Sequence, residues 1–141
     1  MNLNSLDRFL AAQEKAYALA LAEIKRGKKR THWMWYIFPQ LRELGRSNMA
    51  YAYGISGLDE AKAYIAHPVL SARLLEISEA LLEHNDKSAY AIFGDIDEIK
   101  LKSSMTLFAI VSEDGSIFHR VLDAFFGGDM DKETLRILNC V

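Results

Sequence analysis

The amino-acid sequence predicts an all-α protein: a single compact domain over residues 1–141 with about seven packed helices, short connections and no significant sheet. Three observations lead to this prediction. Apolar residues recur at intervals of three and four along almost the whole chain, which is the spacing of one helix face. Capping residues, glycines and two prolines divide this pattern into segments of helix length. The length also suits one domain, because a chain of this size can bury a single core.

The first two helices are predicted from their ends as well as from their apolar spacing. Residues 6–24 should form a helix that Asn4 and Asp7 open, in the manner of an N-cap and its acidic partner. A second helix should run from about residue 31 until Pro39 stops it, because the residue before a proline disfavours the helical conformation. A short loop rich in Lys and Arg would then join the two helices.

Two further helices are predicted in the middle of the chain. Ser56 with Asp59 resembles a capping box, which predicts a short helix that ends at about Ala66. Pro68 suits the first turn of the next helix, where its missing N–H costs no helical hydrogen bond. The apolar stripe of that helix consists of Leu70, Leu74, Ile77 and Leu81. So continuous a stripe predicts a central helix.

The last third of the chain should hold three helices. Asp95 with Glu98 opens the first of them, and the breaker residues 113–115 end it. Its inward face should consist of Ile99, Ser103, Leu107 and Ile110. Residues 116–126 should form the next helix, which two glycines close, and Asp131 can cap a short final one.

Composition and motifs exclude several classes of function. A net charge of −2 creates no general attraction to polyanions, so nucleic acid is not an expected partner. No apolar run is long enough to span a membrane, and the amino terminus lacks a signal-peptide pattern. The single cysteine, Cys140, cannot form an internal disulfide, which favours a cytoplasmic location. Metal-ligand, phosphate-loop and dinucleotide-binding patterns are absent, so neither a metal nor a cofactor is expected.

The clearest departure from the amphipathic pattern lies in residues 32–40, whose sequence is HWMWYIFPQ. On a helix these aromatic side chains would point to several sides at once. They are therefore either buried in the core on all sides or form the wall of a pocket. The pocket interpretation gains from the polar atoms of the segment, because indole, hydroxyl, imidazole and amide groups all need partners when they are buried.

A second departure occurs in residues 100–106, where two lysines and three hydroxyl side chains interrupt an apolar helix. The structural interpretation is that Ser103 faces inward and bonds to the preceding turn. Lys102 and Thr106 lie four residues apart and share a helix face, on which they could hold an anion. Arg46 could add a guanidinium group to the same region.

These departures supply the candidate site residues. His32 is the candidate proton-transfer group, because it is the one histidine inside the aromatic segment, and Ser104 is the second catalytic candidate. The candidate ligand-binding residues are Trp33, Trp35, Tyr36, Gln40, Arg46, Lys102, Ser103 and Thr106. No residue is assigned to a metal.

Several blocks of the sequence, taken in order, resemble a known family. The blocks are Asp7-Arg8-Phe9, His32 to Gln40, Gly45-Arg46-Ser47, Tyr53-Gly54-Ile55, His67 to Leu70, Phe93-Gly94, Lys102 to Phe108 and Phe126-Gly127-Gly128. Over nearly the whole chain they are similar to the family called domain of unknown function 1810. The resemblance implies a compact all-α domain and no established activity. Members are sometimes labelled calpastatin-like, but calpastatin inhibits through disordered segments, and the composition of this chain predicts a compact fold.

Two classes of function remain open. The first is a domain that binds or hydrolyses a small anionic molecule, with a phosphorylated nucleotide or nucleotide-derived sugar as the ligand, in a site between residues 31–40 and 100–108. The second is a helical protein-interaction module without catalytic activity, in which the basic run at residues 25–30 or a helical groove meets a partner. The sequence does not specify an oligomeric state.

Overall fold

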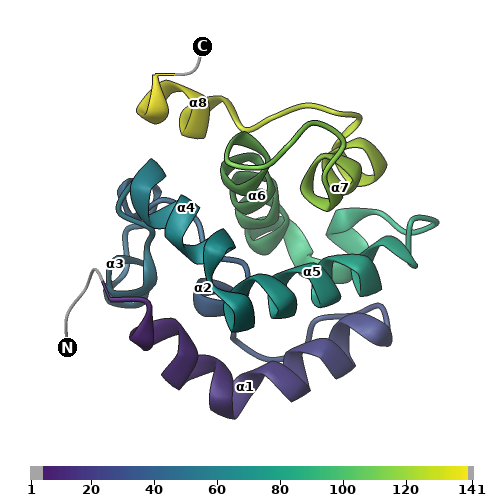
Figure 1. Ribbon diagram of the computed structural model, residues 1–141. Helices are drawn as coiled ribbons and strands as arrows, with labels where there is room; N and C mark the ends of the chain where they lie inside the picture. Colours follow the sequence, from purple (N-terminus) through teal and green to yellow (C-terminus); the bar gives the residue numbers. More distant parts are fainter. Residues whose placement is uncertain (1–4, 140–141) are drawn as a thin grey trace.

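The computed structural model describes residues 5–139, which form eight α-helices and one 3-10 helix (Figure 1). The α-helices are α1 (Asp7–Lys25), α2 (Met34–Ile37), α3 (Asn48–Tyr53), α4 (Leu58–Ala66), α5 (Pro68–Leu82), α6 (Ala89–Ile110), α7 (Ile117–Phe126) and α8 (Lys132–Leu138), and the 3-10 helix η1 is Arg42–Leu44. Within these residues the only extended pairing is a bridge between Leu41 and Ile55, so the all-α prediction is confirmed. Asn4 and Cys140, on which two of the sequence predictions rest, lie outside the described residues.

Helix α6 runs through the middle of the molecule and packs against α4, α7 and α8 (Figure 1). Helix α7 packs against α6, α5 against α7, and α1 against α5, while α8 covers α6 at the far side from α1. The predicted stripe of α5 is buried along its whole length and consists of Leu70, Leu74, Ile77 and Leu81. It shares one core with Leu107 and Phe108 of α6.

Several helix ends follow the local signals in the sequence. The hydroxyl of Ser116 accepts a hydrogen bond from the backbone N–H of His119 at 3.4 Å and begins α7. A carboxylate oxygen of Asp131 accepts one from the N–H of Thr134 at 2.9 Å and begins α8. Gly127 ends α7 with a φ of 62°, a left-handed conformation that glycine adopts without strain. These three ends are as predicted.

The helix over the aromatic segment is much shorter than predicted. Only Met34–Ile37 is helical, which is a single turn. Before it, the carboxylate of Glu23 accepts hydrogen bonds from the backbone N–H groups of Arg30 and Thr31, and these bonds hold the chain in a non-helical conformation. After it, Phe38 leaves the helical region with φ −121° and ψ 72°, as expected before a proline.

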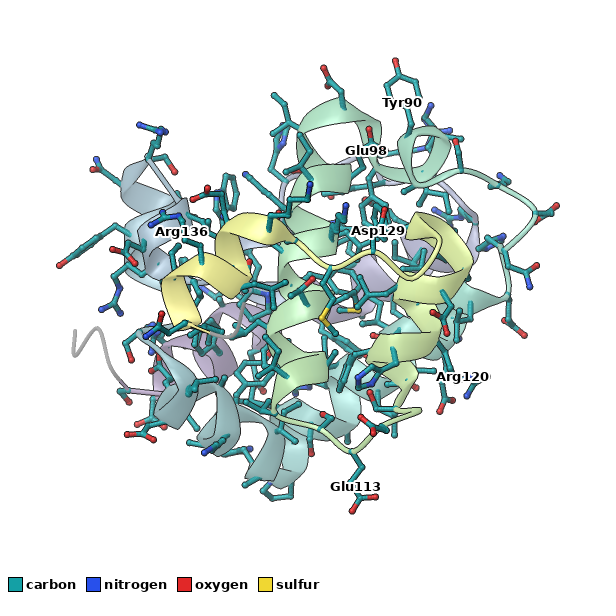
Figure 2. All side chains as sticks on the ribbon, turned by 90° about the horizontal axis from the view of Figure 1, so that it is seen from above. Tyr90, Glu98, Glu113, Arg120, Asp129 and Arg136 are labelled. Carbon is teal, nitrogen blue, oxygen red and sulfur yellow. The ribbon has the colours of Figure 1, made fainter. Side chains whose placement is uncertain are left out.

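Helix α6 begins earlier than predicted. Ser88 caps it by accepting a hydrogen bond from the N–H of Ala91 at 3.0 Å. The predicted opening at Asp95 is instead the point where the helix resumes after Gly94, whose φ of 83° and ψ of 172° interrupt it. Ile99, which was expected to face inward, is 62% exposed. In Figure 2 the neighbouring Glu98 lies beyond α8, the helix that carries Arg136.

The predicted capping box of Ser56 and Asp59 is replaced by another arrangement. Helix α4 begins after Gly57, and Glu60 rather than Asp59 accepts the backbone N–H of Ser56, at 2.9 Å. Glu60 turns inward because its carboxylate also pairs with Arg8 on α1. Helix α3 is the additional element for which the apolar spacing predicts no helix.

Candidate functional site

The start of the aromatic segment is anchored by Glu23, a buried residue near the end of α1. Its carboxylate accepts four hydrogen bonds, two from backbone N–H groups, one from the hydroxyl of Thr31 and one from the indole N–H of Trp33 at 2.9 Å. Burial alone would raise the pKa of this carboxyl, but the hydrogen bonds lower it to about 2. Glu23 therefore remains charged and fixes the position of Trp33.

Most of the aromatic segment belongs to the core. Its buried apolar side chains are Trp33, Met34, Ile37 and Phe38. The ring of Phe38 contacts that of Phe93 on α6 edge to face, with 6.0 Å between the ring centroids. Trp35 and Tyr36 are only half-buried, so they form the part of the segment that a ligand can reach.

A narrow cleft opens beside Trp35, between α2, α3 and α6. It is lined by Met34, Trp35, Phe38, Gln40, Ala50, Tyr53, Gly54 and Lys100. The enclosed space is about 10 Å³, which is enough for one water molecule or one oxygen of a larger ligand. Two of the candidate binding residues, Trp35 and Gln40, thus line one cleft, and α6 contributes Lys100 to it.

The cleft contains hydrogen-bonding groups that the protein leaves unused. The side chains without a hydrogen-bond partner among the described residues are Trp35, Gln40 and Tyr53. An indole and an amide elsewhere in the protein are paired. The indole of Trp33 donates to Glu23 at 2.9 Å. The buried amide of Gln13 donates to the carbonyl of Tyr36 at 2.7 Å and to the hydroxyl of Tyr64 at 3.0 Å. The cleft therefore offers free donors to an acceptor from outside.

Lys100 brings positive charge to the cleft. Its ammonium lies 5.5 Å from the centroid of the Trp35 ring and 3.9 Å from Oδ1 of Asp97, at the outer limit of an ion pair. The other carboxylate oxygen of Asp97 lies only 2.9 Å from the ammonium of Lys29. Asp97 is therefore shared between two ammonium groups, which together carry one more positive charge than the carboxylate can neutralise. The excess positive charge is available to a ligand.

A buried ion pair, of which only Arg8 belongs to a family-like block, holds the α3 wall of the cleft. The guanidinium of Arg8 donates two hydrogen bonds to the carboxylate of Glu60, at 2.9 and 3.0 Å. It also donates to the carbonyls of Ala52 and Gly54, at 2.9 and 2.8 Å. A Cβ atom at Gly54 would lie 2.3 Å from the backbone of η1, so only glycine fits there. These contacts fix the end of α3 and with it the position of Tyr53.

The hydroxyl-bearing candidates of α6 lie outside the cleft. The hydroxyl of Ser103 donates to the carbonyl of Ile99 at 3.1 Å, which is the expected bond to the preceding turn. Thr106 is buried, and its hydroxyl accepts the backbone N–H of Asp131 at 2.8 Å. Ser104 is also buried, and its hydroxyl has no partner within the part of the chain that the structure describes. All three side chains pack inside the protein.

Lys100 occupies the position that the sequence predicts for Lys102. The ammonium of Lys102 lies 5.8 Å from the ring centroid of Phe126 on α7, away from the cleft. Two residues along a helix differ by about 200° in direction, so only one of the two lysines can face α2. Apolar spacing does not fix that rotation when both neighbouring faces are apolar. Tyr53 carried a better signal, because it belongs to one of the family-like blocks.

The remaining candidates are dispersed. His32 and Arg46 are exposed, and neither lines the cleft. Tyr36 faces a separate open groove, which it shares with Met49 and with residues of α1. Burial, with a smaller effect of neighbouring Tyr53, raises the pKa of Tyr36, so its hydroxyl stays protonated at neutral pH.

Comparisons with known proteins identify the family of this chain. The model of the family described as "Protein of unknown function (DUF1810)" matches residues 3–138. The chain belongs to this family. Among solved structures, the DUF1810 chain is similar to the conserved hypothetical protein Rv1873 from Mycobacterium tuberculosis, with 43% identity over 96% of this chain and 97% of that chain, and a TM-score of 0.93. No curated protein matches the DUF1810 chain.

Over residues 5–139 no helix has the length and apolar character to cross a membrane. In the same range, no group of three or more His, Cys, Asp or Glu side chains is placed to hold a metal ion.

Proposed function

We propose that the protein binds a small anionic molecule at the cleft between α2, α3 and α6. The observation that carries this proposal is the set of unused donors on Trp35, Gln40 and Tyr53, beside a positive charge on Lys100. These donors are partly exposed, so the oxygens of an anion can reach them and accept their hydrogen bonds. No carboxylate lines the cleft to repel such a ligand.

The size of the cleft limits which part of a ligand can enter it. A space of about 10 Å³ admits an oxygen of a phosphate or carboxylate, so the rest of the molecule would lie outside. The ligand class we propose is a phosphorylated nucleotide or a nucleotide-derived sugar. Its phosphate would pair with Lys100, and its planar base could stack on the half-exposed ring of Trp35.

The lining residues favour binding over hydrolysis. None of them is an acid, a histidine, a serine or a cysteine. The lining residues that can transfer a proton are Lys100 and Tyr53, and no acid or histidine lines the cleft to activate either of them. His32 lies outside the cleft, and Ser104 lies in the core. We therefore propose that the protein binds its ligand without catalysis, and that neither His32 nor Ser104 has a catalytic role. The cytoplasmic location stays a prediction.

The proposal is tested by calorimetric titration with ADP, a nucleotide sugar and inorganic phosphate. Lys100→Ala should weaken binding by about 1.5–3 kcal/mol, the range for a hydrogen bond to a charged group. The free energy of unfolding should change little, because the ion pair of Lys100 with Asp97 is long and partly exposed.

Lys102→Ala is the matched control, since it removes the same residue type from the same helix. Binding should be unchanged in this variant, because Lys102 contacts Phe126 and not the cleft. A loss of binding with Lys102→Ala but not with Lys100→Ala would move the site to the other face of α6. If none of the three probes binds the wild-type protein, the proposal is wrong.

The second class of function, a protein-interaction module, is favoured by a separate observation. Three apolar side chains at the start of α6, those of Tyr90, Ile96 and Ile99, are each more than 60% exposed. Exposed apolar groups that gather on one element commonly mark a contact surface. This surface would have no catalytic role.

A further inference from the structure

We propose that two copies of this chain associate through the start of α6. The α6 surface, as we call it, consists of Tyr90, Ile96 and Ile99 with the charged residues around them. These three side chains are exposed by 62%, 67% and 62%, which makes them the most exposed large apolar side chains among the described residues. They lie within ten residues of one another in the sequence, on both sides of the kink at Gly94. The inference does not depend on the proposed ligand.

The basic loop after α1 borders this surface. Lys28 and Lys29 line a shallow hollow together with Tyr90 and Gly94. The backbone N–H of Lys29 also donates to the carbonyl of Ile92 at 2.8 Å, which fastens the loop to the start of α6. Tyr90 and the basic loop therefore share one hollow, directly before the kink at Gly94 that leads to Ile96 and Ile99.

Both signs of charge are left unpaired on the α6 surface. On the basic side, no acidic partner within residues 5–139 pairs with Lys28, whereas the ammonium of Lys29 lies 2.9 Å from Asp97. The unpaired acidic side chains are Asp95 and Glu98 on α6. Figure 2 shows Glu98 and Tyr90 at the same edge of the molecule.

This pattern of charge fits a second copy better than an unrelated partner. In a two-fold dimer the same surface serves both chains, so the basic part of one copy can face the acidic part of the other. A partner of uniform charge would leave one set of charges without a counterpart or opposed by like charge. The apolar side chains of the two copies would then meet near the symmetry axis.

The first test is sedimentation velocity over about 5–500 µM protein, a range that resolves a weak dimer. We expect the wild-type chain to dimerise and Ile96→Glu to raise the dissociation constant at least about tenfold, because the variant places like charges against each other at the centre of the contact. Leu75→Glu on α5 is the matched control, since Leu75 is also exposed, by 44%, but lies on another helix. It should leave the dimer unchanged.

The second test uses charge reversal. Lys28→Glu and Glu98→Lys should each weaken self-association, because each variant carries excess charge of one sign on the shared surface. An equimolar mixture of the two variants should form a mixed dimer, in which every reversed residue again faces an opposite charge. High salt should reduce all of these differences.

Three outcomes would overturn the proposal. The wild-type chain could remain monomeric up to about 500 µM, the highest concentration of the test. A dimer could form but be unaffected by Ile96→Glu, which would place its contact elsewhere. The mixed charge-reversal variants could associate no better than either variant alone, which would exclude the two-fold arrangement.

Discussion

At the level of single residues, Glu23 decides the conformation of the chain that follows α1. The first N–H groups of a helix have no partner within that helix, so they need acceptors from elsewhere. A carboxylate on α1 takes the N–H groups of Arg30 and Thr31 before a helix can begin there. The indole of Trp33 binds to the same carboxylate. One buried acid thus shortens α2 and directs a large ring into the core.

Acid should remove the contribution of Glu23 to stability. Its folded pKa of about 2 lies below the ordinary value, so the stabilisation is complete above about pH 5 and is lost as the pH falls toward 2. A shift of this size corresponds to about 3 kcal/mol. Because glutamine resembles the protonated acid, Glu23→Gln should lower the free energy of unfolding at pH 7 by about that amount. Urea unfolding of the wild-type protein at pH 7 and pH 3 measures the loss of stability in acid. Comparison of the two proteins at pH 7 measures the effect of the substitution.

The exposed Glu14 of α1 supplies the control for this experiment. Glu14→Gln should change stability by less than about 0.5 kcal/mol, as is usual for surface substitutions. If the stability of Glu23→Gln fell between pH 5 and pH 2 as steeply as that of the wild-type protein, other carboxylates would account for the acid sensitivity.

At the level of elements, the interruption of α6 determines what the start of this helix contacts. Gly94 has φ 83° and ψ 172°, a conformation that is essentially restricted to glycine. The turn before it, residues 89–93, can therefore take a different direction from the rest of the helix. Phe93 then packs on Phe38 of the aromatic segment, while Tyr90 remains exposed.

Gly94→Ala should destabilise the protein by about 1–3 kcal/mol through backbone strain alone. A Cβ atom at this position would meet no other atom within 4 Å, so the cost cannot come from a steric clash. Gly57→Ala is the matched control, because its Cβ would also meet nothing and its φ of 167° is extended backbone that any residue adopts. Equal stabilities of the two variants in urea would contradict the strain argument.

At the level of the whole molecule, distant parts of the chain depend on one another. The Arg8–Glu60 pair joins α1 to α4, and the bond from Asp131 to Thr106 joins the segment before α8 to α6. Buried side chains of α1, α2 and α4 to α7 belong to one hydrophobic core. Elements that share a core in this way are expected to unfold together.

We therefore expect one cooperative unfolding transition in urea. Both tryptophans, Trp33 and Trp35, lie at α2, so their fluorescence reports on the candidate site, whereas circular dichroism at 222 nm reports on all the helices together. The two signals should have the same midpoint. A fluorescence transition at lower urea concentration would show that the aromatic segment unfolds separately and would contradict the prediction of a single domain.

The sequence by itself determined most of the helical segments, with the exception of α3 and the length of α2, and where several of them end. Apolar spacing and caps act within a few residues, so the caps at Ser116 and Asp131 and the stripe of α5 could be predicted without any knowledge of the fold. It also determined that the aromatic segment was unusual. The pocket interpretation directed attention to Trp35 and Gln40, which lie in one cleft.

Only the tertiary structure decided which polar groups are consumed and which are left over. Trp33 and Thr106 carry the same kinds of group as the cleft residues, but partners distant in sequence already bind them. The choice of Lys100 over Lys102 depends on how α6 is rotated against α2, and packing along the whole helix sets that rotation. A hydrogen bond or an ion pair depends on distance in space, and sequence spacing fixes that distance only within one element.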